Sequence, residues 1–482
     1  MLTRINIALH GAVFLALVLF SGYGLIDFLF IITSLAATCV GGHIALRKAQ
    51  SRKENARGVL LIGITLFFWA AYTIKLAIAL VAVKNFWVVP KLIDSEQLFA
   101  ALPEAYAVAS LGYLSLLVSI LAFPVTYHID WTIRENRARP ITTLLVAGTG
   151  LLVKYMLKSY FLLGIPGVDP ISMGIPFLAG AVTLAIGFSF LFLVNIPVFL
   201  ALVSGRRGYL ALALVIAFAN GGIDLRFGSK NTILFEIALV PIYLSILYQG
   251  IYSGRRQFIK TARLLIIGVG SFGLMILAAY KYMNFFRFAL LLDTKDVAQA
   301  IALAAANDNA QSRSSLMDII NRLTGIEALG AVMHLTQQIQ MPGSLIAFID
   351  GSVVRHFTQV VLGSVEAKTL FSMTQFGYFY VGGGLGAVVL GSLVVGFVFA
   401  FIQYFTFRSF PVHHNMKLAF LPILWLSFVL LLLGGGNLVL WSKDMLVTLV
   451  LFFIISRISV RYEKPSASRQ NPGGAAFAAR RR

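Results

Sequence analysis

Apolar runs of about 18 residues or more recur along the chain, with short polar segments between them. The runs do not alternate apolar and polar positions as barrel strands do, and helices satisfy their own backbone polar groups in lipid. The pattern predicts an all-α polytopic integral membrane protein. We expect about twelve transmembrane helices, at roughly residues 5–22, 25–46, 58–83, 106–128, 143–164, 175–203, 209–223, 231–250, 264–283, 376–404, 418–437 and 445–460.

One long segment, residues 284–375, has no obvious membrane span. Near its middle, apolar residues recur at three- and four-residue spacing, the period of one helix face. Ser314 or Ser315 can cap the start of this helix, and Pro342 with Gly343 can end it. We therefore expect an amphipathic helix over about 315–339, lying on or against the bundle. Its apolar face would comprise Leu316, Ile319, Ile320, Leu323, Ile326, Leu329 and Met333.

Composition supports the membrane class, since 59% of the 482 residues are hydrophobic, 12% are charged, and the mean hydropathy is +0.86. The net charge of +20 does not indicate a nucleic-acid partner, because the basic residues fall in short loops and in the tail. Cys39 is the single cysteine, which excludes a disulfide framework and a cysteine-based metal site. The first apolar run resembles a signal peptide, but a second run follows directly, so we expect an uncleaved span.

The basic residues also predict the orientation. If successive connections between spans lie on alternate sides of the membrane, they form two groups. The group that includes both termini holds 23 Lys and Arg, whereas the short loops of the other group hold 5. The first group is expected in the cytoplasm. The chain then divides into nine helices over 1–283, a large helical periplasmic loop over 284–375, three helices over 376–460 and a disordered basic cytoplasmic tail over 461–482.

Candidate chemistry in the outer loop centres on the expected helix. Glu327 and His334 are seven residues apart on one face and are candidate bases for a sugar hydroxyl. Asp318 and Arg322 can pair at four-residue spacing, and Arg is suited to phosphate. The simpler alternatives are a surface ion pair for Asp318 and Arg322, and the solvent-facing side of an interfacial helix for Glu327 and His334. We expect no metal site, because His334 has no second ligand at a suitable spacing.

Three lysines lie inside expected spans: Lys75, Lys154 and Lys158. Lys154 and Lys158 are one turn apart on one face; Lys158 can extend toward the interface, whereas Lys154 near mid-depth is expected to line a polar cavity. Arg226 and Lys230 flank a Gly-Ser turn at an outer boundary. They could bind an anion at the start of the next helix, or could simply be boundary cations.

The segment from about 220 to 405 resembles the Wzy family of O-antigen and repeat-unit polysaccharide polymerases. The likeness rests on the many-span layout with a late outer loop and on three stretches. They are FGSKNTILFEIAL, NRLTGIEALGAVMHL followed by MPGSLIAFI, and the glycine-rich FGYFYVGGGLGAVVLGSLVVGFVFAF. Lys230 stands where the family pattern has Arg.

The resemblance implies a metal-independent glycosyltransferase of the bacterial inner membrane, without a cofactor or a nucleotide donor. A sugar hydroxyl of one lipid-linked repeat unit would attack the anomeric carbon of a glycan on undecaprenyl pyrophosphate. The expected catalytic residues are Glu327, His334 and Arg322. The residues expected to bind pyrophosphate are Arg226, Lys230, Arg287, Arg313, Arg355, Lys154 and Lys158. The implied partners are this lipid-linked glycan, membrane lipids and a chain-length regulator of the polysaccharide co-polymerase type.

Three other functions stay open on the sequence alone. An O-antigen ligase shares the layout and a basic loop, but transfers the glycan to lipid A-core. A polysaccharide transporter or lipid flippase is disfavoured, because charges inside spans are sparse and the outer loop is large. A structural membrane scaffold would not need a charge such as Lys154 at mid-depth.

Overall fold

The computed structural model describes a set of helices and the residues beside them. The described residues are 2–49, 55–82, 95–125, 128–130, 140–161, 199, 207–226, 259, 262, 263, 266, 267, 270, 271, 325–338, 356, 373–409, 414–434 and 438–459. They are almost all helical, with no strand among them. Five helices in this part of the chain are long and apolar enough to cross a membrane, at Leu2–Phe20, Leu25–Ala49, Ala56–Val81, Ser95–Ala122 and Thr374–Arg408. The expectation of an all-α membrane protein is thus confirmed for the described residues.

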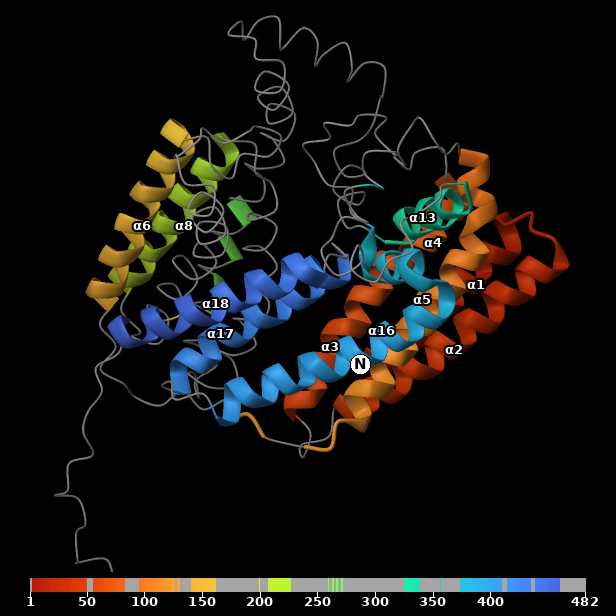
Figure 1. Ribbon diagram of the computed structural model, residues 1–482, viewed down its shortest axis with the longest axis horizontal. Helices are drawn as coiled ribbons and strands as arrows, with labels where there is room; N and C mark the ends of the chain where they lie inside the picture. Colours follow the sequence, from red (N-terminus) through yellow and green to blue (C-terminus); the bar gives the residue numbers. More distant parts are fainter. Residues whose placement is uncertain are drawn as a thin grey trace, which may run out of the picture.

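The first four expected spans form one bundle, seen in red and orange in Figure 1. Its helices pack in the order of the chain, and α5 lies against both α2 and the later helix α16. The third span is one continuous rod in which a π-helical segment, η2, joins two α-helices. The bounds are α1 Leu2–Phe20, α2 Leu25–Ala49, α3 Asn55–Phe68, η2 Trp69–Ile74, α4 Lys75–Ala82 and α5 Ser95–Ala122.

Helix α5 begins eleven residues before the position expected from the sequence, 106. Glu96, Pro103 and Glu104 obscure the helical pattern, since proline usually ends or bends a helix. The early turns nevertheless carry a buried stripe at helical spacing, Leu98, Leu102, Ala105 and Tyr106. Much of the segment expected as an outer loop over 84–105 is therefore the first part of a packed helix.

A buried polar network joins α1 and α2 to the third span and α5. The Asn6 side chain donates to the backbone oxygen of Cys39 at 2.8 Å and accepts from the Trp69 indole at 3.0 Å. The Thr38 hydroxyl lies 3.3 Å from His10 Nε2 and 3.2 Å from the Tyr106 hydroxyl. Hydrogen bonds between helices specify register in a medium where apolar side chains gain little by meeting one another.

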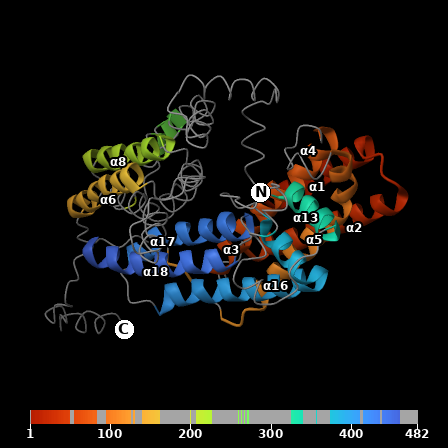
Figure 2. The ribbon, with the colours of Figure 1, turned by 45° about the horizontal axis from the view of Figure 1, so that its top comes forward.

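Helix α16 (Thr374–Arg408) crosses the bundle along α5 (Figure 2). It is kinked where Gly384 has φ +62, a conformation that glycine adopts without steric penalty. Beyond the kink, Gly396 lies so close to α5 that a Cβ atom there would collide with Ser119 and lie 3.1 Å from the backbone oxygen of Leu116. Gly396 thus lets the two helix backbones approach closely.

Because α5 leaves no room for a side chain at Gly396, we expect Gly396→Val to destabilise the chain by about 1–3 kcal/mol through overpacking. The measurement is the thermal midpoint of the purified chain in detergent. Gly148→Val in α6 is the matched control, because no atom of the described residues lies within 4 Å of a Cβ atom at Gly148. Equal midpoints for the two variants would show that the close approach at Gly396 carries no stability.

Five other described elements lie toward the opposite side of the molecule. Helices α6 and α8 lie beyond α17 and α18 as seen from the α1–α5 bundle, in both views (Figures 1 and 2). Helix α6 corresponds to the fifth expected span and α8 to the seventh. Helix α17 with η4 corresponds to the eleventh, α18 to the twelfth, and α16 to the tenth. The bounds are α6 Pro140–Phe161, α8 Arg207–Arg226, α17 His414–Leu426, η4 Ser427–Gly434 and α18 Leu438–Ser459. The sixth, eighth and ninth expected spans and the tail over 461–482 fall almost wholly outside the described residues.

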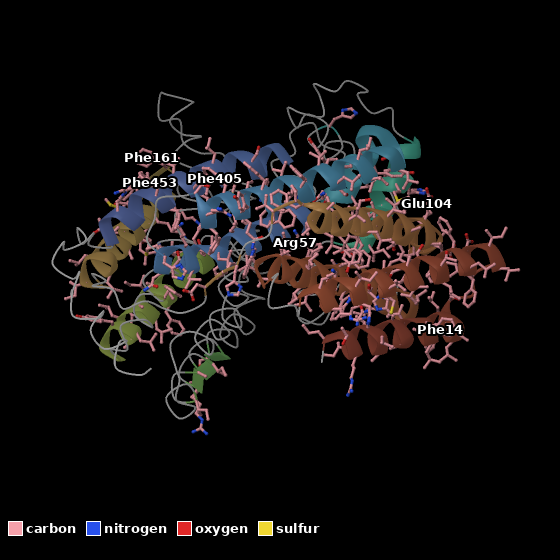
Figure 3. The ribbon with its side chains drawn as sticks, turned by 90° about the horizontal axis from the view of Figure 1, so that it is seen from below. Phe14, Arg57, Glu104, Phe161, Phe405 and Phe453 are labelled. Atoms are coloured by element: carbon pink, nitrogen blue, oxygen red, sulfur yellow. The ribbon has the colours of Figure 1, made fainter. Side chains whose placement is uncertain are left out.

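The outside of the helix assembly is apolar. Phe14 projects from α1 away from its neighbours, and Phe405 and Phe161 are likewise exposed (Figure 3). Among the polar groups inside the bundle, Arg57 donates to the backbone oxygens of Leu121 and Phe123 and so covers the end of α5. An apolar exterior is what a lipid environment requires.

Candidate functional site

The loop helix expected from the sequence is present as α13, Ile326–Gln338. It packs against α5, the start of α16 and α4. Ile326, Leu329 and Met333, three members of the expected apolar face, are buried. The first half of the expected helix, with Asp318 and Arg322, lies outside the described residues.

Glycines dock α13 closely against the bundle. A Cβ atom at Gly325 would overlap the backbone oxygen of Ala71 in η2, and one at Gly330 would lie 3.2 Å from Leu98 Cδ1 on α5. A Cβ atom at Gly377 of α16 would lie 3.4 Å from the side chain of Val332 on α13. The segment is therefore embedded among three helices, and is not an interfacial helix with one wet face.

Glu327 forms a buried ion pair with Lys75. Its Oε1 accepts from the Lys75 Nζ, and the two side chains are 7% and 1% exposed. The alternative that Glu327 belongs to a solvent-facing side is therefore wrong. Lys75 begins α4 immediately after η2, and π-helical turns occur frequently at functional sites. The pair fixes α13 to the third span by charge as well as by packing.

Two buried oxygens at this pair have no close hydrogen-bond partner in the described chain, the Tyr72 hydroxyl and Glu327 Oε2. Both side-chain amide atoms of Gln375, on the first turn of α16, are also without a partner there. The Tyr72 hydroxyl lies beside Thr374 and within the electrostatic influence of Glu327. Thr374 has φ +62, a conformation that a β-branched residue rarely adopts. Unpartnered buried groups beside backbone strain are features that collect at functional sites.

His334, the second candidate base, lies two turns along α13 from Glu327 and is half-buried. Seven residues of α-helix rise by about 10 Å, so the two side chains leave the helix at separate levels. The structure thus places both candidates on the same docked helix, but only Glu327 belongs to the ion-pair cluster.

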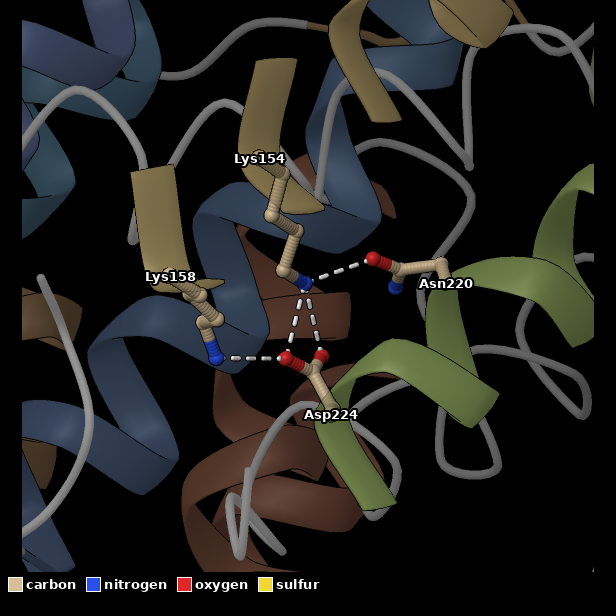
Figure 4. Close-up of polar contacts among 4 residues, drawn as sticks. All are labelled: Lys154, Lys158, Asn220 and Asp224. Atoms are coloured by element: carbon tan, nitrogen blue, oxygen red, sulfur yellow. Dashed lines mark hydrogen bonds and ion pairs between the residues drawn. The ribbon is translucent and has the colours of Figure 1, made fainter. Parts of the chain in front are cut away.

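A second buried charge cluster joins α6 to α8 (Figure 4). The Lys154 ammonium donates to Asn220 Oδ1 at 2.7 Å and to Asp224 Oδ2 at 2.9 Å, and Lys158 donates to Asp224 Oδ1 at 2.9 Å. All four side chains are buried. Lys158 is 3% exposed, so the expectation that it extends toward the interface is wrong.

The carboxylate of Asp224 explains why two lysines can be buried there. The sequence analysis missed it because Asp224 falls one residue past the expected seventh span. Asn220 and Asp224 are four residues apart, as Lys154 and Lys158 are, so the two pairs occupy matching faces of neighbouring helices. This shared four-residue spacing is the feature of the sequence from which the contact between the two helices could be predicted. Lys154 therefore faces a polar partner, and the structure brings neither lysine to α13 (Figures 1 and 2).

Arg226 ends α8 and is exposed. Its guanidinium donates to the Tyr155 hydroxyl at 2.7 Å and lies 5.3 Å from the centre of that ring. A cation at a helix C-terminus is favourable to the helix dipole. The remaining expected binding or catalytic residues, Lys230, Arg287, Arg313, Arg322 and Arg355, lie outside the described residues.

Comparison with known proteins gives no family. No family model matches the chain, and no curated protein or solved structure gives a significant match. In the described part of the chain, no group of three His, Cys, Asp or Glu side chains could hold a metal ion. The chemistry of the site must therefore be argued from the residues themselves.

Proposed function

We propose that this chain polymerises undecaprenyl-pyrophosphate-linked oligosaccharide repeat units into O-antigen or exopolysaccharide chains on the outer side of the bacterial inner membrane. In this proposal twelve spans place both termini in the cytoplasm and α13 on the outer side. The observation that carries the proposal is the carboxylate of Glu327, held on one oxygen by Lys75 with the other oxygen unpartnered, within the segment that resembles the Wzy family.

The proposed reaction needs a base for the acceptor hydroxyl and cations for the leaving pyrophosphate. Glu327 supplies the base and His334 is the second candidate. Arg226, Lys230, Arg287, Arg313, Arg322 and Arg355 are the candidate cations. We assign Lys154 and Lys158 a structural role instead, because Asp224 already occupies their ammonium groups.

The test is complementation of a strain that lacks this gene, with glycans separated by size at matched membrane levels of the chain. We expect wild type to restore a ladder of repeat units. Glu327→Gln should reduce the ladder to single units, a loss of about 100-fold or more for removal of a general base. His334→Ala and Arg322→Ala test the second base and the first cation in the same gel.

Two other outcomes would redirect the proposal. Long lipid-linked chains that accumulate without reaching lipid A would indicate the ligase alternative. A deletion strain with normal glycans would contradict both enzyme functions and favour transport. A normal ladder from Glu327→Gln with a lost ladder from His334→Ala would move the base to His334.

A further inference from the structure

Two buried side-chain oxygens at the Lys75–Glu327 pair have no close hydrogen-bond partner in the described chain. They are the Tyr72 hydroxyl and Glu327 Oε2, and electrostatic interaction between the two residues places them near one another. Roughly nine in ten or more buried polar groups in proteins have a partner, so these two oxygens need a reason. Tyr72 is fully buried, and Glu327 is 5% exposed.

The side chains of this cluster are held in place by their neighbours. Tyr72 lies in η2, and Lys75 is the first residue of α4 three positions further along the same span. The Tyr72 ring stacks on Phe68 with centroids 5.2 Å apart and meets Phe376 at 5.5 Å, which orients its hydroxyl. The Thr374 hydroxyl accepts from the backbone of Gly377 at 3.2 Å, which holds the strained start of α16 beside Tyr72.

The charges of the cluster select its ligand. Lys75 and Glu327 balance, so an anion gains no net attraction and would face the unpartnered oxygen of Glu327. A metal cation would face the Lys75 ammonium. A neutral hydroxyl fits both unpartnered groups, because it can donate to Glu327 Oε2 and accept from the Tyr72 O–H.

We infer that Tyr72, Lys75 and Glu327 form the subsite for the attacking hydroxyl of the acceptor sugar, with Lys75 as a positioning residue. The inference rests on the proposed polymerase function. Glu327 Oε2 takes the proton of the acceptor hydroxyl while the oxygen of that hydroxyl forms a bond to the anomeric carbon of the donor. The bond from that carbon to pyrophosphate breaks, and the lipid pyrophosphate leaves with the electron pair. Glu327 then returns the proton to solvent.

The same geometry indicates how the subsite is reached. Glu327 and Lys75 are closed off in the docked arrangement, and α13 is pressed onto η2 at Gly325. The proposed subsite therefore requires α13 to move away from η2 and α4 for the acceptor to enter. Lys75 holds the Glu327 carboxylate against the third span once α13 returns.

The first test is Tyr72→Phe in the complementing strain, with the lipid-linked units that the host supplies as the probe. We expect about tenfold less polymer, the effect of one lost hydrogen bond. The thermal midpoint should fall by less than in the control below, because the Tyr72 hydroxyl makes no close hydrogen bond in the described chain beyond its contact with Thr374. Tyr113→Phe is the matched control. Its hydroxyl is equally buried but lies 3.0 Å from Thr65, so this change should lower the midpoint and leave polymerisation unchanged.

The second test separates positioning from a merely structural ion pair. Lys75→Met should lower both the amount of folded chain and polymerisation. The charge swap Lys75→Glu with Glu327→Lys should restore the amount of folded chain. Polymerisation should stay at least tenfold below wild type, because the carboxylate is then attached to the third span and no longer to α13.

Each remaining outcome has one meaning. A wild-type ladder from Tyr72→Phe, or a charge swap that restores polymerisation with folding, would overturn the subsite and leave a structural pair, bridged at most by water. A wild-type chain that fails to restore any ladder would overturn the proposed function itself. The two failures are therefore distinguishable in one gel.

Discussion

Asp224→Asn is expected to reduce the stability of the chain by about 3–5 kcal/mol, the usual effect of removing one partner of a buried ion pair. The carboxylate accepts from both Lys154 and Lys158, so one substitution weakens two ionic contacts between α6 and α8. The amide keeps the size of the side chain, which confines the change to charge. The measurement is the thermal midpoint in detergent, with the yield of folded chain as a second reading.

Asp27→Asn is the matched control for this substitution, because Asp27 is an exposed carboxylate in the first turn of α2. It should shift the midpoint little. The triple variant Lys154→Met, Lys158→Met and Asp224→Leu should recover most of the stability, since apolar side chains can replace a buried charge cluster. An Asp224→Asn midpoint equal to that of Asp27→Asn would show that the α6–α8 contact does not depend on charge.

The apolar pattern predicted the helices well and their partners poorly. Spacing correctly placed Ile326, Leu329 and Met333 on the buried face of α13, because a repeat of three and four residues defines one side of a helix. The same spacing says nothing about what covers that side. Lys75 and Glu327 are 252 residues apart, and only the packing of α13 onto the third span brings them together.

Local exceptions misled the sequence analysis elsewhere. The start of α5 was placed too late because Pro103 and two glutamates interrupt an otherwise helical stripe, which tertiary packing keeps helical. Asp224 was overlooked because a carboxylate at a span boundary resembles the beginning of a polar loop. In both segments the residues that read as a break in the pattern are part of a packed helix.

The π-helical segment η2 had no sequence signal at all. Trp69–Ile74 is as apolar as the turns around it, so composition could not separate it from α-helix. Its presence nonetheless shifts the side chains that follow along the third span, including Lys75. The position of Lys75, which pairs with the candidate base Glu327, therefore depends on a backbone feature that only the three-dimensional structure reveals.

Gly325→Val is expected to undock α13 and to lower polymerisation at least about tenfold, since displaced catalytic groups lose the advantage of orientation. Any side chain at position 325 would occupy the space of the Ala71 carbonyl, which belongs to the backbone of η2 and cannot rotate away. The start of α13 must then shift, and Glu327 follows it away from Lys75. The measurement pairs the glycan ladder with thiol labelling of Leu329→Cys in a Cys39→Ser background.

Leu329 is fully buried, so a cysteine there should resist a polar maleimide in the detergent-solubilised chain and react once Gly325→Val is added. Gly11→Val is the matched control, because in the described part of the chain nothing lies within 4 Å of a Cβ atom at that position of α1. A protected Cys at 329 with a normal ladder would show that α13 docks without the close approach at Gly325. A reactive Cys at 329 with a normal ladder would show that polymerisation does not need α13 docked, and Glu327 would then be excluded as the base.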